Sequence, residues 1–310
     1  MATSSPVAAS SAVVAPAAAA RAADYGRLIA VPAIWGGTFV GGKYVVGAMS
    51  ALMGSFLRYV IACAALLVAA FVLERGLPRL TRQQWIATFV LGLLGVFAYN
   101  LFFMGALERL PASRAALIIA LNPVITISIS SLVLGERLKG RRWLGVAIAL
   151  FGVWIVVSHG DIAAFTQAGV GMGELFMLCA VTSWALYTII GRKVLSGLTP
   201  LAATNYAALW GTLLLGLYAL PHLGELQASM FSWRVVVALV YLGVFGTAVA
   251  FVWYYTSIKR LGASVASIFT NLVPVFGVAI SVLVLGEPLL PSMLVGGAVA
   301  ITGVFMVSRP

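Results

Sequence analysis

The residues of this sequence that could do chemistry lie inside long apolar stretches. Arg58 stands about two helical turns into one stretch, and Lys43 lies close to the end of another. A charge at such a depth in a membrane helix is a candidate for function. Arg58 therefore either fixes carbonyl groups at helix ends or attracts a substrate carboxylate. Lys43 either reaches the outer lipid headgroups or contacts the substrate.

Two prolines and two asparagines recur at matching places. Pro123 directly follows Asn122, and Pro274 follows Asn271 by three positions. A proline inside a helix removes a backbone donor and frees the carbonyl one turn earlier. Freed carbonyls are tolerated at membrane depth only against protein or water. We therefore expect bent helices near the membrane midplane, with amides facing a central cavity; a kink without a binding site is the alternative.

Aromatic residues and glycines complete the set of candidates. Trp35 and Trp184 stand at similar places in two related stretches and either line a cavity or face lipid. Gly37 and Gly41 are four positions apart, which permits close helix packing; direct contact with a ligand is the alternative. The candidate substrate-binding residues are Trp35, Tyr99, Asn100, Asn122, Trp184, Asn271 and Arg58, and the candidate cavity-shaping residues are Pro123, Pro274, Gly37 and Gly41.

Catalytic, metal-binding and energy-coupling patterns do not occur in the sequence. All 8 acidic residues lie in loops or at helix ends, so no carboxylate is placed to relay protons at the midplane. There is no Walker-type loop, and neither His159 nor His222 has a catalytic partner nearby in sequence. Cys63 and Cys179 are interpreted as buried small hydrophobic residues. We expect no enzyme, no cofactor, no metal site and no ATPase subunit.

The composition requires a lipid environment. Of the 310 residues, 62% are hydrophobic and 9% are charged, against roughly 25% charged residues in a soluble domain. A membrane helix needs about 20 mainly apolar residues, and the apolar runs are too long for barrel strands. The sequence thus predicts an all-α integral membrane protein. Its ten predicted transmembrane helices are at about 28–46, 51–73, 85–106, 112–133, 143–158, 171–191, 200–220, 235–258, 262–285 and 293–307.

The chain also repeats itself at an offset of 151 residues. Matching pairs are Gly92 and Gly243, Gly95 and Gly246, Arg109 and Arg260, Ala112-Ser113 and Ala263-Ser264, Pro123 and Pro274, and Leu134-Gly135-Glu136 and Leu285-Gly286-Glu287. Five helices per repeat, an odd number, insert the second half in the opposite orientation, as in many secondary transporters. We therefore expect one repeat at 27–158 and a second, inverted repeat at 171–309.

The placement of basic residues gives the orientation. The net charge is +11, and most of the 19 lysines and arginines fall on one side when the N-terminus is placed in the cytoplasm. This pattern predicts that both termini are cytoplasmic, with membrane lipid and no nucleic acid as a partner. Residues 1–26 are expected to form a disordered cytoplasmic tail, and a cleaved signal peptide is the alternative for their first part.

The sequence resembles the EamA-type ten-helix transporters of the drug/metabolite transporter superfamily. The resemblance covers Arg27 to Arg309, and the Ala-rich extension before Arg27 departs from it. It implies an inner-membrane carrier with a central cavity and alternating access; known members include exporters of amino acids and related metabolites. The motifs that carry it are Trp35-Gly36 with Lys43, Phe56-Leu57-Arg58, Ala106-Leu107 before Ala112-Ser113, Asn122-Pro123 and Leu134-Gly135-Glu136, with their copies in the second half.

These observations together predict a secondary transporter in the bacterial inner membrane. A mostly apolar, aromatic cavity with a few amides suits a small neutral or zwitterionic molecule, so we expect export of amino acids or related metabolites. Export of drugs or nucleosides is the alternative within transport. A membrane receptor that binds a ligand without moving it is the alternative outside transport.

Overall fold

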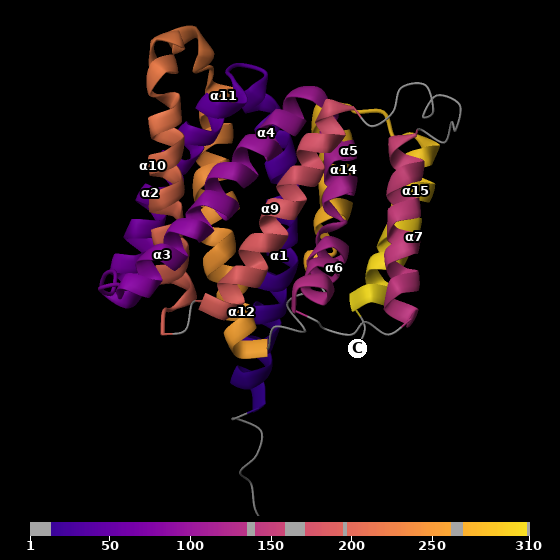
Figure 1. Ribbon diagram of the computed structural model, residues 1–310, viewed down its shortest axis with the longest axis horizontal. Helices are drawn as coiled ribbons and strands as arrows, with labels where there is room; N and C mark the ends of the chain where they lie inside the picture. Colours follow the sequence, from indigo (N-terminus) through magenta and orange to yellow (C-terminus); the bar gives the residue numbers. More distant parts are fainter. Residues whose placement is uncertain (1–13, 135–139, 159–170, 195–196, 262–268, 309–310) are drawn as a thin grey trace, which may run out of the picture.

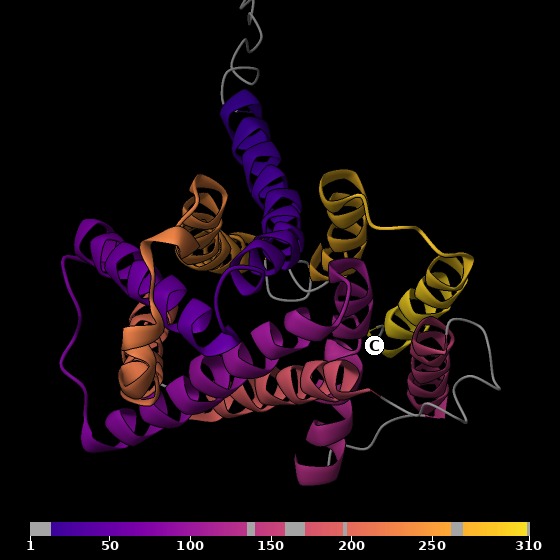
Figure 2. The ribbon, with the colours of Figure 1, turned by 90° about the horizontal axis from the view of Figure 1, so that it is seen from above.

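The computed structural model describes residues 14–134, 140–158, 171–194, 197–261 and 269–308, and the regular elements in these ranges are all helices (Figure 1). The helices stand side by side in one bundle, as the view from above also shows (Figure 2). The prediction of an all-α membrane protein is therefore confirmed. Within the described ranges, 8 helices are long and apolar enough to cross a membrane, and α14 and α15 are shorter apolar helices. The count of ten and the location of the termini stay predictions.

The first half of the chain contains α1 (Val14–Val46), α2 (Ala51–Glu74), α3 (Arg82–Leu91), the π-helix η1 (Gly92–Ala98), α4 (Tyr99–Arg109), α5 (Ala112–Ile119), α6 (Asn122–Leu134) and α7 (Gly140–Val157). The second half contains α9 (Met172–Val194), α10 (Pro200–Ala219), the 3₁₀ turns η2 (Leu220–Glu225) and η3 (Ala228–Met230), α11 (Trp233–Val240), the π-helix η4 (Tyr241–Val249), α12 (Ala250–Leu261), α14 (Val273–Leu285) and α15 (Pro291–Ser308).

Helix α1 begins earlier than the sequence led us to expect. It is helical from Val14, so residues 14–26 form part of a helix instead of a disordered tail. The reason lies in the alanine-rich composition of this stretch, because alanine has the highest helix propensity. Its proline, Pro16, stands in the first turn, where a helix accepts proline. The remainder of the predicted tail, residues 1–13, lies outside the described residues.

The outer surface of the bundle is apolar. Phe71 of α2, Leu132 of α6 and Leu283 of α14 expose 65%, 77% and 83% of their surface. Such large apolar side chains rarely gather on the surface of a soluble monomer. Their exposure fits helices whose solvent is lipid.

Helices α7 and α15 pack closely against each other at one side of the bundle (Figure 2). Gly152 lies against the backbone of Gly296 and Ala300, and Gly303 lies against the backbone of Gly145 and Ala149. Small residues at this spacing let two helix backbones approach, which replaces the hydrophobic driving force that is missing between helices in lipid. The last helix of each predicted repeat thus contacts the other.

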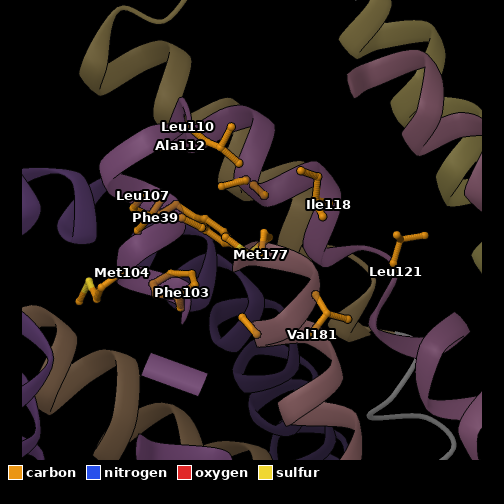
Figure 3. Close-up of a cluster of buried hydrophobic side chains, with 14 of the residues drawn as sticks. Phe39, Phe103, Met104, Leu107, Leu110, Ala112, Ile118, Leu121, Met177 and Val181 are labelled. Atoms are coloured by element: carbon orange, nitrogen blue, oxygen red, sulfur yellow. The ribbon is translucent and has the colours of Figure 1, made fainter. Parts of the chain in front are cut away.

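A buried apolar cluster fills the end of the bundle where α4 meets α5, which we call the α4–α5 end (Figure 3). Phe39 of α1 and Phe103 of α4 meet edge to face with ring centroids 5.3 Å apart, and Met177 of α9 is fully buried beside them. Ile118 of α5 is exposed by only 1%. Helices from both halves of the chain are therefore packed together at this end.

Candidate functional site

The prolines at the predicted midplane begin new helices. Helix α5 ends at Ile119, a turn follows, and Pro123 is the second residue of α6. Pro274 is likewise the second residue of α14, after a turn at 271–272. We predicted a bent but continuous helix at each proline, and the structure instead has a break. The first turn of a helix accepts proline because its N–H would have no intrahelical partner there.

The two predicted asparagines lie at these breaks. Asn122 is the first residue of α6, half-buried, and its Oδ1 has no hydrogen-bond partner among the described residues. Asn271 is half-buried in the turn before α14. Neither side chain is among those that line the central cavity described below.

Two π-helical segments, η1 and η4, occupy related positions in the two halves. Each contains a repeated glycine pair, Gly92 and Gly95 in η1 and Gly243 and Gly246 in η4. A Cβ at Gly95 would clash with the Tyr187 ring, so the glycines allow neighbouring elements to approach. π-Helical turns are rare and often occur at functional sites. Sequence reasoning found the glycine pairs but missed the change of helix type.

Helix α1 packs on η4 through its predicted glycines. Gly37 leaves room for the Tyr241 ring, whose hydroxyl donates a hydrogen bond of 2.7 Å to the carbonyl of Ile34. A Cβ at Gly41 would lie 3.3 Å from the Leu242 side chain. These contacts are the close packing that the four-residue spacing predicted.

Aromatic rings from four elements meet at the centre of the bundle. Trp184 of α9 lies 5.3 Å from Tyr99, 5.3 Å from Tyr187 and 6.1 Å from Phe251, measured between ring centroids. Trp35 of α1 lies 5.9 Å from Phe251. The structure therefore brings together the predicted residues Trp35, Tyr99 and Trp184. Tyr187 and Phe251 join them, and sequence reasoning did not single these two out.

The indole of Trp35 already has a hydrogen-bond partner. Its Nε1–H donates a bond of 3.1 Å to the carbonyl of Gly246 within η4. An aromatic ring whose donor is satisfied by the protein offers mainly its apolar face to a ligand. Trp35 thus contributes shape more than polarity to the centre.

A small cavity lies beside this cluster, lined by Tyr59, Trp184, Tyr187, Thr247 and Phe251 among others. Its volume is about 10 Å³, which is the room of roughly one water molecule. Small-molecule sites usually measure about 300–1,000 Å³. The aromatic side chains must therefore move apart before a metabolite fits.

Arg58 of α2 is buried next to this cavity, with 5% of its surface exposed. Its Nη2 lies 3.4 Å from Thr247 Oγ1 of η4, and its guanidinium carbon lies 5.3 Å from the centre of the Tyr59 ring. Nε has no hydrogen-bond partner, and no carboxylate of the described residues forms an ion pair with Arg58.

Asn100 of α4 is fully buried close to Arg58. Its Nδ2 donates a hydrogen bond of 2.7 Å to the carbonyl of Val96. Its backbone carbonyl accepts a hydrogen bond of 3.2 Å from Ser55 of α2, about one turn before Arg58, and its Oδ1 has no hydrogen-bond partner among the described residues. The amide is thus half satisfied, with an acceptor free.

Lys43 binds the end of a neighbouring helix. Its Nζ donates hydrogen bonds of 2.8 Å and 3.1 Å to the carbonyls of Leu107 and Leu110, at the C-terminal end of α4. A cation is favourable there because the last carbonyls of a helix have no intrahelical partner. Both alternatives considered for Lys43 are therefore replaced by a helix-capping role.

The repeated Leu-Gly-Glu motif gains a role at the same end of the bundle. Gly286 ends α14 in the left-handed region with φ of 67°. The carboxylate of Glu287 then accepts hydrogen bonds of 2.7 Å and 2.8 Å from the backbone N–H groups of Ala112 and Ser113, at the start of α5. A motif of the second half thus caps a helix of the first half. In the sequence, the Ala-Ser motif and the Leu-Gly-Glu motif both recur at the offset of 151 residues, and this shared recurrence was the signal that could have indicated the contact.

The fold and the centre define a multi-pass, all-α membrane protein in which broken and π-helical segments surround an aromatic core. The chain belongs to the EamA-like transporter family, which matches residues 27–158 and 171–309. The name of the family indicates a transporter.

Three similar proteins illustrate the relationship. The uncharacterized transporter YyaM of Bacillus subtilis is 29% identical over 92% of this chain and 93% of its own length. A protein of Streptantibioticus cattleyicolor, named as a probable terminal-alkyne amino-acid exporter, is 29% identical over 82% of this chain and 83% of its own. A solved crystal structure matches with a TM-score of 0.62 at 21% identity, covering 93% of this chain and 97% of its own, which supports the fold.

Proposed function

We propose that this protein is a secondary transporter of the bacterial inner membrane that exports amino acids or related small metabolites. The observation that carries the proposal is the aromatic cluster around Trp184, which lies between η1 and η4 beside the buried Arg58 and Asn100. Apolar walls with a few polar groups suit a small zwitterion that has an apolar side chain. The name of the Streptantibioticus relative supports the same substrate class.

Alternating access is the proposed mechanism. The α4–α5 end is filled by the buried cluster around Phe39 (Figure 3), and Glu287 caps α5 at the same end. The breaks before Pro123 and Pro274 and the π-segments interrupt four helices near the centre. The regular i→i−4 hydrogen-bond pattern is already interrupted at these places, so the helices can change direction there at a lower cost than within a regular α-helix. The two halves would exchange conformations to expose the centre on one side and then on the other.

Counterflow in proteoliposomes tests this proposal. Vesicles with purified protein are loaded with unlabelled amino acids, and uptake of the same labelled amino acid is followed; protein-free vesicles are the control. We expect accumulation with apolar amino acids, including one with a terminal alkyne. Absence of counterflow for every amino acid would overturn the substrate class.

Export of drugs or nucleosides is the second candidate, because flat aromatic faces such as those of Trp184 and Tyr99 also stack on planar rings. A growth-protection screen in cells that express the protein separates the two classes. Protection against toxic amino-acid analogues supports the first, and protection against nucleoside analogues alone supports the second. A protein that binds ligand but carries no flux in vesicles would instead be a receptor.

A further inference from the structure

We propose that Arg58 binds the carboxylate of the transported molecule and that Asn100 Oδ1 accepts a hydrogen bond from its ammonium group. This inference rests on the proposed function and names the chemical groups that the central site selects. It predicts that an α-amino acid is preferred over the same molecule without its carboxylate.

The first observation is the contrast between the buried Arg58 and Arg114, which is partly buried. Arg114 of α5 has 13% of its side chain exposed and pairs with Glu174 at 2.7 Å. Arg58 is buried more deeply, yet no carboxylate of the described ranges pairs with it. A buried charge without a counter-ion is costly, and in membrane helices such charges mark substrate or ion sites. An anion that arrives from outside the chain resolves this imbalance.

The second step is the availability of donors. A guanidinium has five N–H groups in a planar fork. The side-chain bond of Arg58 to Thr247 is long, at 3.4 Å, and Nε has no partner. The ring of Tyr59 lies within cation–π distance of the guanidinium, with 5.3 Å between the guanidinium carbon and the ring centroid. The remaining donors suit the two oxygens of a carboxylate, which Arg binds with two parallel hydrogen bonds.

The third step is position. Tyr59 and Thr247, the two residues that contact Arg58, both line the small central cavity together with Trp184 and Phe251. A ligand that widens this cavity therefore meets the aromatic faces and the guanidinium at the same time. Its apolar part would pack on the rings, and its carboxylate would lie against Arg58.

The fourth step distinguishes an amino acid from a simple carboxylic acid. Asn100 Oδ1 is a buried acceptor without a hydrogen-bond partner among the described residues, and the Asn100 side chain lies near the Tyr59 side chain. An unpaired donor and an unpaired acceptor near one ring complement the carboxylate and the ammonium group of a zwitterion. A simple anion such as chloride would bind only the donor, Arg58, and not the acceptor, Asn100 Oδ1.

Competition in the counterflow assay tests the inference. Labelled phenylalanine is the probe, and the competitors are phenylalanine, its decarboxylated amine, its methyl ester and the corresponding acid that lacks the ammonium group. We expect the amine and the ester to compete at least about tenfold less well than phenylalanine, because they lack the charge-assisted bond to Arg58. The acid without the ammonium group should compete less well than phenylalanine but better than the amine and the ester.

The variants Arg58→Met and Arg58→Lys identify the residue responsible. Arg58→Met should remove the preference for the carboxylate, so that amine and amino acid compete alike, and Arg58→Lys should keep part of it. Arg234→Met is the matched control, because Arg234 is an exposed arginine that also lies over an aromatic ring, that of Trp233. Its competition profile should be that of the wild type.

The outcomes separate this inference from the function on which it rests. If the wild type shows phenylalanine counterflow but does not distinguish the amino acid from its amine, the Arg58 assignment is wrong and the transport function stands. The same holds if Arg58→Met is folded and keeps the wild-type profile. If no amino acid shows counterflow, the proposed function fails first. Should Arg58→Met not fold, the wild-type competition still decides.

Discussion

At the scale of the residue, Trp184 is, among the described residues, the aromatic side chain with the most ring contacts beside the central cavity. Its indole contacts Tyr99, Tyr187 and Phe251, and together these rings leave a cavity of about 10 Å³. Removing the ring enlarges the cavity at the cost of packing. Phe/Trp→Ala changes in a core cost about 3–5 kcal/mol, and the half-buried position of Trp184 places its cost towards the lower end.

We therefore expect Trp184→Ala to lower the unfolding temperature and to weaken amino-acid binding, whereas Trp184→Phe should largely retain both. Unfolding in detergent and the KM for counterflow measure the two effects. Trp143→Ala is the control, because Trp143 of α7 is a tryptophan 44% exposed on the surface of the bundle. A central site is contradicted if both alanine variants have the same KM.

At the scale of the element, the contact of Glu287 with α5 holds the α4–α5 end closed. Both carboxylate oxygens bind N–H groups at the start of α5, where a negative charge is also favoured by the helix dipole. Helices α14 and α5 belong to different halves, so this end cannot open without breaking the cap. Glu287→Gln keeps the shape of the side chain but replaces one acceptor by a donor.

We expect Glu287→Gln to open the α4–α5 end more often. The measurement is the reaction of Ile118→Cys, buried at this end (Figure 3), with a water-soluble maleimide after Cys63 and Cys179 have been replaced by alanine. Hydrogen bonds to charged groups contribute about 1.5–3 kcal/mol, so the loss of one should speed labelling by roughly tenfold or more. Equal labelling with and without Glu287→Gln would mean that the cap does not control opening.

The same scale shows what the sequence could and could not predict. Apolar runs indicated the membrane helices, and the two prolines indicated where a helix departs from regular geometry, because both signals follow from local chemistry. The breaks in place of the predicted bends were not foreseen. The π-helical segments did not follow, since they depend on contacts far apart in the chain: Gly95 against Tyr187, and Gly246 against Thr38. For the site, residue types predicted Trp35, Tyr99 and Trp184 as neighbours. The hydrogen bond of Trp35 to the Gly246 carbonyl and the ring contacts of Phe251 could be found only from the folded structure.

At the scale of the whole molecule, the two halves are joined in different ways at different places. The Glu287 cap and the buried cluster join the halves at the α4–α5 end, and the proposed alternating access would require these contacts to change. The α7–α15 pair lies apart from the aromatic centre and packs backbone against backbone (Figure 2). A contact without room for rotamer changes is suited to staying intact while the rest of the bundle moves.

This division predicts that a large side chain in the α7–α15 contact damages the assembly of the halves and not the binding site. Gly152→Leu and Gly303→Leu each place a side chain against the backbone of the opposite helix. Overpacking typically costs about 1–3 kcal/mol, and both variants should lose similar stability because the contact is nearly symmetric. Gly140→Leu is the control, since a Cβ on Gly140, also on α7, meets nothing within 4 Å. Thermal unfolding of the purified proteins measures the effect, and the KM of the folded fraction should remain that of the wild type. If Gly152→Leu changes the KM while stability is unaffected, α7 and α15 take part in the moving machinery.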